Sequence, residues 1–300
     1  MSKVKKFIKN IKTEIKYQYI KNMSSDKYEE FLEQEYQKRT GEELNIKEPQ
    51  KYTEKVQYAK LYLNSPLKTR LSDKYLVREW VENRIDTKYL IPLLGVWDDF
   101  SEIDFEKLPN EFVLKLNNGS DTNVIVKDKS NINFEKTKIK FDKWLDINFG
   151  YYKDIQLQYK NIKSKIIAEK FIEDSNGKLP EFKFFCFNGK VYYCWFIINE
   201  KDNEYRNVYD LNWDLQPWNI NNIYENYPRE LPKPENFDEM VKIAETLCQG
   251  FSHVRVDLYN VDGKIYFGEM TFTSGGGYSL IYPEKYNYSL GKLWDLEETK

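Results

Sequence analysis

The sequence has 300 residues, with 46 Lys and Arg against 48 Asp and Glu, and its formal net charge is −2. This balance provides no overall positive field, so we expect no nucleic-acid partner. A single histidine and three scattered cysteines exclude a histidine-rich metal site, a zinc cluster and a disulfide framework; they favour a reducing cytoplasm and leave oxygen ligands, hence Mg²⁺ or Mn²⁺, for any metal.

The N-terminus is rich in lysine and predicts a helix. Among the lysines, apolar residues recur at helical spacing, at Phe7, Ile8, Ile11, Ile15 and Tyr19. Such a helix can lie on an anionic membrane surface, which would place a cytoplasmic protein at the inner face of the membrane. It can equally be a structural helix with a solvated lysine face. The sequence has no apolar run of membrane-spanning length and no signal-peptide core.

The rest of the first half predicts helices and then strands. Residues 1–60 are expected to form a helical N-terminal extension, in which a helix from Asp26 to Arg39 ends at Gly41 and helical structure continues over 42–63. Asn64, Ser65 and Pro66 break the pattern, and Ser72 or Asp73 caps a helix that contains Lys74 and runs to Arg84. The segments that follow are expected to be a strand over 91–97, strands over 112–116 and 124–126 joined by a turn, a helix over 134–149, and a strand over 166–172.

The second half is rich in hairpins. Asn188-Gly189 joins strands over 182–187 and 191–198, because this dipeptide favours the two-residue hairpin turn. Residues 206–229 are expected to be a loop, and Asn236 or Asp238 caps a helix over 240–248. A second hairpin turns at Asp262-Gly263. Helices followed by antiparallel hairpins indicate an α+β fold.

The second hairpin carries three charged residues that we expect to converge. Arg255 and Asp257 alternate with Val254 and Val256, so they share one face of the sheet, and Glu269 lies on the adjacent strand. Two carboxylates and a guanidinium on one face are unfavourable unless another group offsets them. A divalent metal that holds a nucleotide phosphate would do so; the alternative is a surface salt bridge.

Two other stretches combine a strand with charge. Lys115 lies in an apolar strand that precedes Asn118, Gly119 and Ser120, whose backbone N–H groups can cradle phosphate; the alternative is a solvent-facing lysine before an ordinary turn. Glu169 and Lys170 end a buried strand, and Glu181 and Lys183 alternate on the next one. Backbone groups exposed at the end of such a strand can form hydrogen bonds with the edge of an adenine. The alternative is an edge strand that displays charged side chains to solvent.

Taken in order, these motifs resemble the ATP-grasp superfamily and, more closely, its TupA-like branch, which is linked with teichuronopeptide and other cell-surface polysaccharide biosynthesis. The resemblance covers residues 60–295 and leaves the first sixty outside. The segments that carry it are 66–78, 108–115, 183–190, 254–259 and 268–272.

The resemblance implies a fold in which two α+β lobes clamp ATP, with segments 61–110, 111–172 and 173–300 following the extension. It implies that Lys74 and Lys115 reach the phosphates and that Arg255 acts with Lys115 in catalysis. The implied nucleotide-binding residues are Lys74, Lys115, Asn118, Gly119, Ser120, Glu169, Lys170, Ile172, Glu181 and Lys183. The implied ligands of Mg²⁺ or Mn²⁺ are Asp257, Glu269 and Thr271; relatives often have Asn in place of Thr271, which is a weaker ligand.

The activity implied is that of an ATP- and Mg²⁺-dependent carboxylate–amine ligase that acts through an acyl phosphate. The expected partners are an amino acid or peptide and a small-molecule or glycan acceptor, namely a cell-surface polysaccharide precursor. Gly275 to Gly277 and Tyr278 could admit the acceptor, and Trp195, Arg206 and Trp213 could flank it or belong to a core. The alternatives are a kinase that phosphorylates a sugar or alcohol and a non-catalytic assembly protein of glycan biosynthesis, the latter favoured by Thr271.

Overall fold

A computed structural model describes residues 3–152, 154–200, 203–220 and 225–296. The helices are α1 Lys3–Lys21, α2 Tyr28–Thr40, α3 Tyr52–Tyr62, α4 Pro66–Ser72, α5 Val77–Arg84, α6 Phe134–Leu145, α7 Phe149–Tyr152, α8 Phe237–Leu247 and α9 Lys285–Leu293. The strands are β1 Leu93–Trp97, β2 Phe112–Leu116, β3 Asn123–Val126, β4 Ile166–Lys170, β5 Glu181–Phe187, β6 Lys190–Glu200, β7 Asn203–Tyr209, β8 Asn219–Ile220, β9 His253–Val261, β10 Lys264–Thr271 and β11 Ile281–Tyr282.

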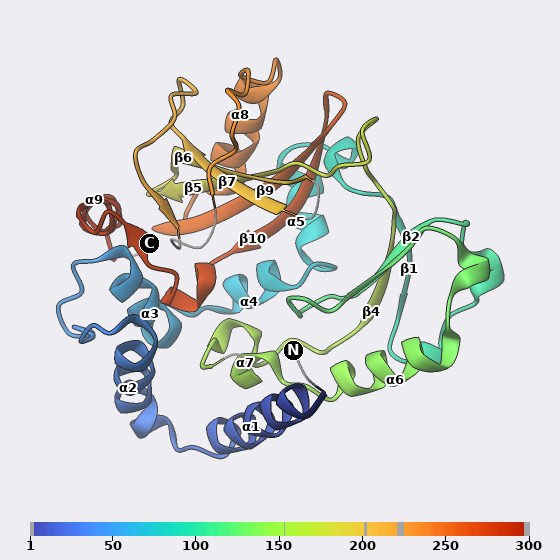
Figure 1. Ribbon diagram of the computed structural model, residues 1–300, viewed down its shortest axis with the longest axis horizontal. Coiled ribbons are helices and arrows are strands. Elements are labelled where there is room, and N and C mark those ends of the chain that lie inside the picture. Colours follow the sequence, from blue (N-terminus) through green and yellow to red (C-terminus); the bar gives the residue numbers. More distant parts are fainter. Residues whose placement is uncertain (1–2, 153, 201–202, 221–224, 297–300) are drawn as a thin grey trace.

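Two antiparallel sheets organise the molecule and confirm the α+β prediction. One has four strands in the order β1-β4-β2-β3, and the other has five in the order β10-β9-β5-β6-β7. Figure 1 shows the two sheets in different halves of the molecule, with the chain of β4 leading from one toward the other. The expected boundary at residue 110 lies between β1 and β2, which belong to one sheet; the division into lobes stays a prediction.

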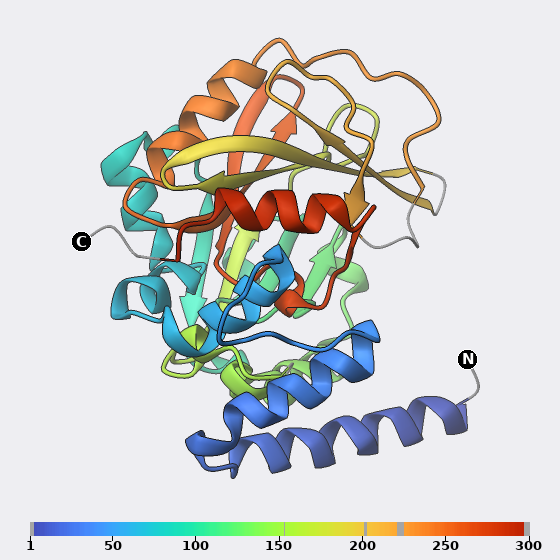
Figure 2. The same cartoon turned by 90° about the vertical axis from the view of Figure 1, so that its left-hand side faces the viewer.

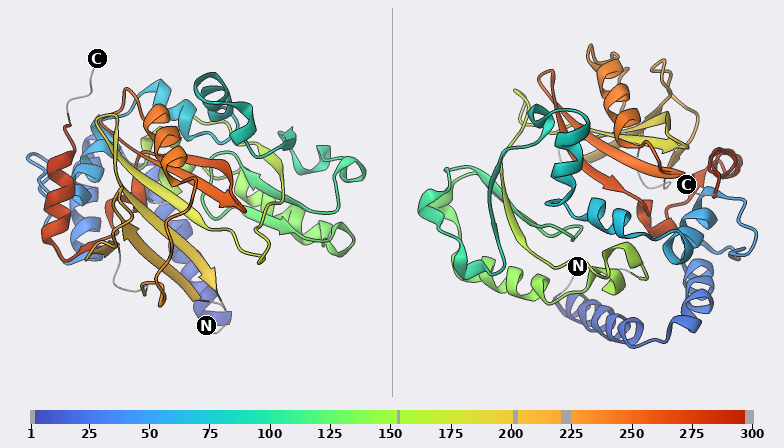
Figure 3. Two further views of the ribbon diagram at one scale, coloured as in Figure 1. Left: turned by 90° about the horizontal axis from the view of Figure 1, so that it is seen from above. Right: turned by 180° about the vertical axis from the view of Figure 1, so that it is seen from behind.

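The two faces of the five-stranded sheet differ in chemistry. On one face, Val254, Val256 and Leu258 of β9 pack in a core with α5 and α8. On the other face, aromatic residues of β5 and β6 pack against α3 and α9, which Figure 3 shows side by side at one end of the molecule. Because side chains alternate along a strand, the remainder of this second face carries Arg255 and Asp257. The helices therefore cover only part of it and leave a polar region between the sheets.

A β-bulge at Gly268 shifts the register of β10. Phe267 lies opposite Leu258, yet Glu269 lies opposite Asp257, so Gly268 is an additional residue in β10. Ile265, Phe267, Met270 and Phe272 all reach the same core. The bulge therefore keeps the apolar side chains on both sides of Gly268 on one face of the sheet. It places Glu269 and Thr271 on the opposite face. A Cβ atom at Gly268 would lie 3.0 Å from the carbonyl oxygen of Asp257.

The N-terminal segment is helical, as the sequence predicts, but α1 packs through Tyr17 and Ile20 and leaves Ile11, Ile15 and Tyr19 of the expected apolar stripe exposed. Tyr17 and Ile20 of α1 are buried against Leu32 and Tyr36 of α2 and against the segment that follows α7. Figure 2 shows α1 stretched along one edge of the molecule with α2 beside it. Gly41 ends α2 with a φ of 77°, a conformation that favours glycine. No helix among the residues described is long and apolar enough to span a lipid bilayer.

Two helix predictions need correction. Residues 42–51 are not helical, and α3 begins only at Tyr52, where the Glu54 carboxylate accepts hydrogen bonds from the backbone N–H groups of Gln50 and Lys51. Ser65 and Pro66, expected only to break a helix, begin α4: Ser65 Oγ accepts from Lys68 N, and proline suits the first helical position.

The segments expected over 206–229 and 134–149 also differ. Part of the expected loop is β7, the edge strand of the five-stranded sheet, where Asn207 is buried and its side chain bonds Tyr209 and the backbone of Tyr227. The sequence of β7 is polar and therefore did not predict a strand. The side-chain amide of Asn207 can be buried because Tyr209 and the backbone of Tyr227 form hydrogen bonds with it. The expected helix over 134–149 divides into α6 and the start of α7.

Candidate active site

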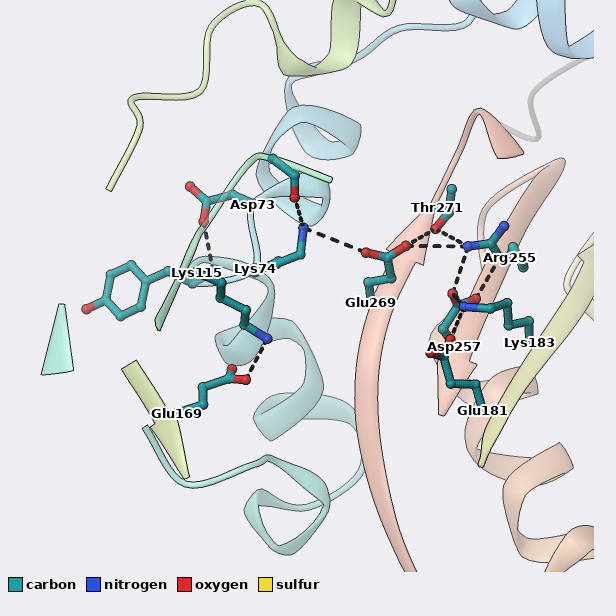
Figure 4. A network of polar contacts seen from close by, with 12 residues as sticks. Asp73, Lys74, Lys115, Glu169, Glu181, Lys183, Arg255, Asp257, Glu269 and Thr271 are labelled. Atoms are coloured by element: carbon teal, nitrogen blue, oxygen red, sulfur yellow. Dashed lines mark hydrogen bonds and ion pairs between the residues drawn. The ribbon is translucent and has the colours of Figure 1, made fainter. Parts of the chain in front are cut away.

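The charged residues of the β9–β10 hairpin converge as predicted. Arg255 donates two hydrogen bonds of 2.7 Å to the two carboxylate oxygens of Asp257, and its Nη2 lies 3.4 Å from Glu269 Oε1. Figure 4 shows these side chains together on one side of the hairpin. The surface salt-bridge alternative is wrong for this pair, because Arg255 and Asp257 are only 7% and 4% exposed.

A second cation reaches Asp257 from the neighbouring strand. Lys183 lies opposite Asp257 in the β5–β9 pair, and its Nζ is 2.9 Å from Asp257 Oδ2. Lys183 also forms an ion pair with Glu181. Burial alone would lower the pKa of Lys183, but the carboxylates of Asp257 and Glu181 outweigh burial and raise it. Lys183 therefore stays charged, and Asp257 is held between two cations.

Glu269 is the more accessible carboxylate of the hairpin. Burial would raise its pKa, but Lys74, Arg255 and Lys183 outweigh that effect and lower the pKa to about 2, so the side chain is ionised near neutral pH. Thr271 Oγ1 donates to Oε1 of Glu269 over 2.8 Å, and Nζ of Lys74 lies 3.7 Å from its other oxygen.

Lys74 approaches Glu269 from the opposite side of the site, as Figure 4 shows. The sequence predicted that Lys74 lies on a helix, but it lies in the turn between α4 and α5. Asp73 Oδ1 accepts hydrogen bonds from the N–H groups of Tyr75 and Leu76 in this turn, and α5 begins only at Val77. Lys74 Nζ donates to the carbonyl oxygen of Gly119 over 2.9 Å. Burial lowers the pKa of Lys74, and the Glu269 carboxylate opposes this effect.

Lys115 on β2 forms an ion pair of 2.5 Å with Glu169 on β4. Both side chains are largely buried, at 20% and 8% exposed, so the alternative of a solvent-facing Lys115 is wrong. Arg78 on α5 also lies 3.6 Å from Glu169. The loop after β2 is compact at Gly119, where a Cβ atom would lie 2.3 Å from Thr122 Oγ1.

A cavity of about 280 Å³ lies between the two sheets; we call it the first cavity. Its walls come from β2, β4 and the loop after β2 on one side and from β5, β9 and β10 on the other. The sequence-predicted residues that line it are Lys74, Lys115, Gly119, Ser120, Glu169, Lys170, Ile172, Glu181, Lys183, Asp257 and Glu269.

A larger cavity of about 520 Å³, the second cavity, adjoins the first. Asn118, Arg255 and Thr271 line it, so every sequence-predicted site residue borders one of the two cavities. Four residues line both cavities, and these are Lys74, Gly119, Ser120 and Glu269. The two spaces therefore meet where the lysine and the glutamate face one another.

Residues expected near an acceptor divide into two groups. Gly275, Gly276 and Tyr278 line the second cavity. Trp195 and Trp213 pack in the two cores on opposite faces of the five-stranded sheet, which confirms their reading as core residues.

The sequence analysis missed several residues of this region. Arg78 and Tyr259 have no local pattern that separates them from ordinary helix and strand positions, although Tyr259 lines the first cavity. Lys16, Arg39 and Asp154 line the second cavity from segments distant in sequence. Only the fold brings these residues together.

The oxygen donors at the meeting point fit a small, hard cation. Glu269 and Asp257 lie opposite one another, and Thr271 Oγ1 adjoins Glu269. No three His, Cys, Asp or Glu side chains of the described residues converge as a complete cage. Proteins usually hold Mg²⁺ through one or two carboxylates together with substrate phosphates and water, and Asp257 and Glu269 provide two carboxylates.

Three solved structures are similar to this chain at low identity. The D-alanine–D-alanine ligase from Bacillus anthracis is 18% identical, with a TM-score of 0.40 over 68% of this chain and 57% of its own. The N5-carboxyaminoimidazole synthetase from Staphylococcus aureus, complexed with ADP, is 12% identical, with a TM-score of 0.40 over 67% and 44%. The L-amino acid ligase from Bacillus licheniformis is 18% identical, with a TM-score of 0.41 over 75% and 47%. The chain thus spans less than two thirds of the length of each.

Sequence comparison assigns the family. No protein with a curated description matches the chain. The profile of the TupA-like ATP-grasp family matches residues 54–295, which include both sheets and leave α1 and α2 outside. The resemblance inferred from the ordered motifs is therefore confirmed. The chain belongs to the TupA-like ATP-grasp family and has the α+β fold of that family.

Proposed function

We propose that the protein is a ligase that uses ATP and Mg²⁺ (or Mn²⁺) to join a carboxylate to an amine. Membership of the TupA-like ATP-grasp family supports the proposal that ATP is the nucleotide substrate. The observation that carries the proposal is the meeting of two cavities at Glu269 and Lys74, because a group-transfer enzyme must present one substrate to the reacting end of another.

The first cavity suits the nucleotide. Lys74 and Lys115 supply ammonium groups for phosphate oxygens, and Asn118, Gly119 and Ser120 supply the loop that covers them. The residues proposed for the base and ribose lie farther along the same cavity, and they are Glu169, Lys170, Ile172 and Glu181, with Lys183 beside Asp257.

The second cavity suits the group that reacts. In the proposed reaction, a substrate carboxylate oxygen attacks the γ-phosphorus and ADP leaves; an amine then attacks the acyl carbon and inorganic phosphate leaves. Mg²⁺ would neutralise the phosphate oxygens. Asp257 and Glu269 would hold it, and Thr271 would contribute through its hydrogen bond to Glu269.

Among the residues of the protein, Arg255 is the proposed catalytic cation that acts beside Mg²⁺. It lines the second cavity, and its guanidinium is fixed by Asp257 and by a 2.7 Å hydrogen bond to Ser274 Oγ. A cation held in this way stabilises negative charge that develops on the transferred phosphoryl group without having to reorganise. The compact loop at Gly119 would exclude water and so protect the acyl phosphate from hydrolysis.

The proposed substrates are an amino acid or peptide and a cell-surface polysaccharide precursor. Support comes from the resemblance to the TupA-like branch and from the second cavity, whose volume of about 520 Å³ accommodates a small polar substrate.

The proposal also includes contact with the inner face of the membrane. Ile11, Ile15 and Tyr19 of α1 are 44%, 64% and 60% exposed. They lie four residues apart on the side of α1 opposite to buried Tyr17 and Ile20. An apolar stripe on a lysine-rich helix fits an anionic lipid surface.

The experiment that tests the function is product analysis by mass spectrometry. The protein is incubated with ATP, Mg²⁺, pools of amino acids and cell-envelope precursors, and ADP release is measured with and without an amine. The ligase predicts an amide product and ADP release that requires the amine. A phosphorylated sugar without an amide would indicate the kinase alternative. Absence of ATP–Mg²⁺ binding by folded protein in calorimetry would indicate a non-catalytic assembly protein.

A further inference from the structure

The N-terminal helices form part of a cavity wall although they lie outside the segment that matches the family. Thr13 and Lys16 of α1 and Arg39 of α2 line the second cavity together with Glu269 and Tyr278. Figure 1 shows α1 along one edge of the molecule and β10 nearer its middle, with α7 between them. The extension therefore contributes to the space where the proposed ligase would hold its substrate.

Lys16 and Arg39 belong to a cluster of four charges. Lys16 Nζ lies 2.5 Å from Asp154 Oδ1 and 2.5 Å from Glu35 Oε2. Arg39 Nη2 lies 2.8 Å from Asp154 Oδ2, and its Nε lies 3.2 Å from Glu35. Each cation is thus held by the same two carboxylates, one from α2 and one from the segment after α7.

The cations and the carboxylates of this cluster are not equally exposed. The side chains of Asp154 and Glu35 are 1% and 11% exposed, whereas those of Lys16 and Arg39 are 29% and 40% exposed. Asp154 also lines the second cavity, whereas Glu35 does not, so the cluster borders this cavity with two cations and one carboxylate and contributes a net positive charge to its wall. Such an arrangement orients the cations and still attracts an anion.

Two further features indicate a built site. Arg39 lies over the ring of Tyr278 at 4.3 Å from its centroid, so the guanidinium is held from a second direction. Asp154 has a φ of 76°, which is unusual for a residue other than glycine. Such strained backbone concentrates at functional sites.

We propose that Lys16 and Arg39 bind a carboxylate of the substrate, and that the N-terminal extension thereby makes the protein selective for substrates that carry this second anionic group. This inference rests on the proposed function. The reacting group would lie near Glu269 and Arg255, while the second carboxylate would contact the side of the cavity formed by α1 and α2. An arginine fork and an ammonium group suit a carboxylate, and hydrogen bonds to charged groups are the stronger kind.

The first test compares variants in the ADP-release assay. The probes are aspartate and glutamate, which carry two carboxylates, and the carboxamides asparagine and glutamine, which carry one, each supplied with ATP and Mg²⁺. Arg39→Gln and Lys16→Gln are expected to raise the KM for the acids about tenfold or more, to leave the KM for ATP unchanged, and to leave the carboxamides unaffected; Arg39→Lys should restore part of the loss.

Lys38→Gln is the matched control. Lys38 also contacts Glu35, at 3.3 Å, but its side chain is 74% exposed and it does not line the second cavity. It should keep the wild-type KM. If the cluster only fastens the helices to the body, Arg39→Gln would lower the melting temperature and leave the KM for the acids unchanged, and that result would overturn the proposal.

A binding measurement keeps the inference testable even if no amino acid is turned over. Malonate is titrated into the full chain in the presence of ADP and Mg²⁺, with uncharged malonamide as its counterpart, and tryptophan fluorescence is recorded. We expect saturable binding of malonate, none of malonamide, and at least tenfold weaker binding in Lys16→Gln. Equal binding of both compounds, or of neither, would refute the inference. Failure of the proposed function is seen separately, as a loss of ATP–Mg²⁺ binding in calorimetry.

Discussion

Glu269 lies directly opposite Asp257 in the β9–β10 pair, yet the two carboxylates differ in what they can bind. The Asp257 side chain is 5% exposed and lies between Arg255 and Lys183, whereas that of Glu269 is 38% exposed and borders both cavities. Asp257 therefore also orders the cations of the site, and Glu269 is the carboxylate that is more open to a metal.

Glu269→Gln should abolish turnover without unfolding the protein. The change removes a charge from a partly exposed position, so the core is unaffected, but it removes the accessible metal ligand. We expect a loss of about 100-fold or more in kcat, measured as ADP release over a range of Mg²⁺ concentrations. Glu33→Gln, on the exposed side of α2, is the control and should behave as wild type. Normal activity of the Glu269 variant would disprove the metal assignment.

Lys115→Met should weaken ATP binding. The variant removes the ammonium group that faces the first cavity and leaves Glu169 with Arg78 at 3.6 Å as its remaining cation. Because a charge-assisted hydrogen bond contributes roughly 1.5–3 kcal/mol, the Kd for ATP should rise about tenfold or more. Calorimetry with ATP and Mg²⁺ measures this, with Lys127→Met as a surface control whose side chain is 59% exposed. An unchanged Kd would reject the phosphate role of Lys115.

Substitutions at Thr271 should separate two roles of its hydroxyl. Thr271 donates to Glu269 and accepts from Arg255 over 3.1 Å. Thr271→Val loses both bonds, and we expect kcat to fall about tenfold. Thr271→Asn supplies an amide oxygen, which is a better ligand for Mg²⁺, and should lower the Mg²⁺ concentration needed for half-maximal ADP release. If valine has no effect, the hydroxyl does not orient Glu269.

Stability should depend on pH through His253, the single histidine of the sequence. Its ring is buried between Cys186, to whose carbonyl oxygen Nδ1 donates, and Tyr52, whose hydroxyl donates to Nε2. Burial, with the nearby positive charges of Arg255 and Lys68, lowers the pKa of His253 to about 3.

The sign of the effect follows from proton uptake. The unfolded chain, with a histidine pKa of about 6.5, binds a proton between that pH and pH 3, whereas the folded chain does not. The stabilisation is complete above the unfolded pKa, and the folding equilibrium constant should fall about tenfold per pH unit as the pH drops below it. Urea unfolding at pH 7.5, 6.5 and 5.5 measures this. His253→Gln should be less stable at pH 7.5 but nearly independent of pH over this range; the same slope in both proteins would contradict the assignment.

Removal of the apolar stripe of α1 should reduce binding to membranes. Ile11→Gln combined with Ile15→Gln affects only exposed side chains, so folding should be unchanged. Burial of such a side chain in lipid contributes about 1.5–3 kcal/mol, and co-sedimentation with anionic vesicles should fall at least tenfold. Glu14→Gln, also exposed on α1, is the control. Absence of wild-type binding to anionic vesicles would contradict membrane contact.

The sequence predicted the parts of this molecule that depend on local pattern. Alternation located Arg255 and Asp257 on one face, and Asn188-Gly189 located the β5–β6 turn at its observed position. The sequence did not predict β7, because the buried side chain of Asn207 accepts a hydrogen bond from the backbone of Tyr227, twenty residues farther along the chain. It also could not place Lys16, Arg39 and Asp154 together, since their contact depends on how α1 and α2 pack against the segment after α7.

Asn117 illustrates the same limit within the site. The sequence indicated only a turn residue, yet its fully buried side chain donates to Asp73 and to the carbonyl oxygen of Lys163 and accepts from the backbone of Lys165. It thereby connects the turn that holds Lys74 to the ends of β2 and β4. Periodicity carries no information about such a bond, because it depends on the closure of three separate segments.

The bulged conformation of Gly268 determines which side of β10 the last acidic side chain occupies. In an uninterrupted strand, residues 265, 267, 269 and 271 would all point the same way, and Glu269 and Thr271 would project into the apolar core between the sheet and α8. Deletion of Gly268 should leave a regular strand in which Glu269 directly follows Phe267, so Glu269 should still face the cavities and Met270 should still face the core. A one-residue insertion is thus accommodated at a single point, and the alternation of apolar and polar side chains continues unchanged beyond it.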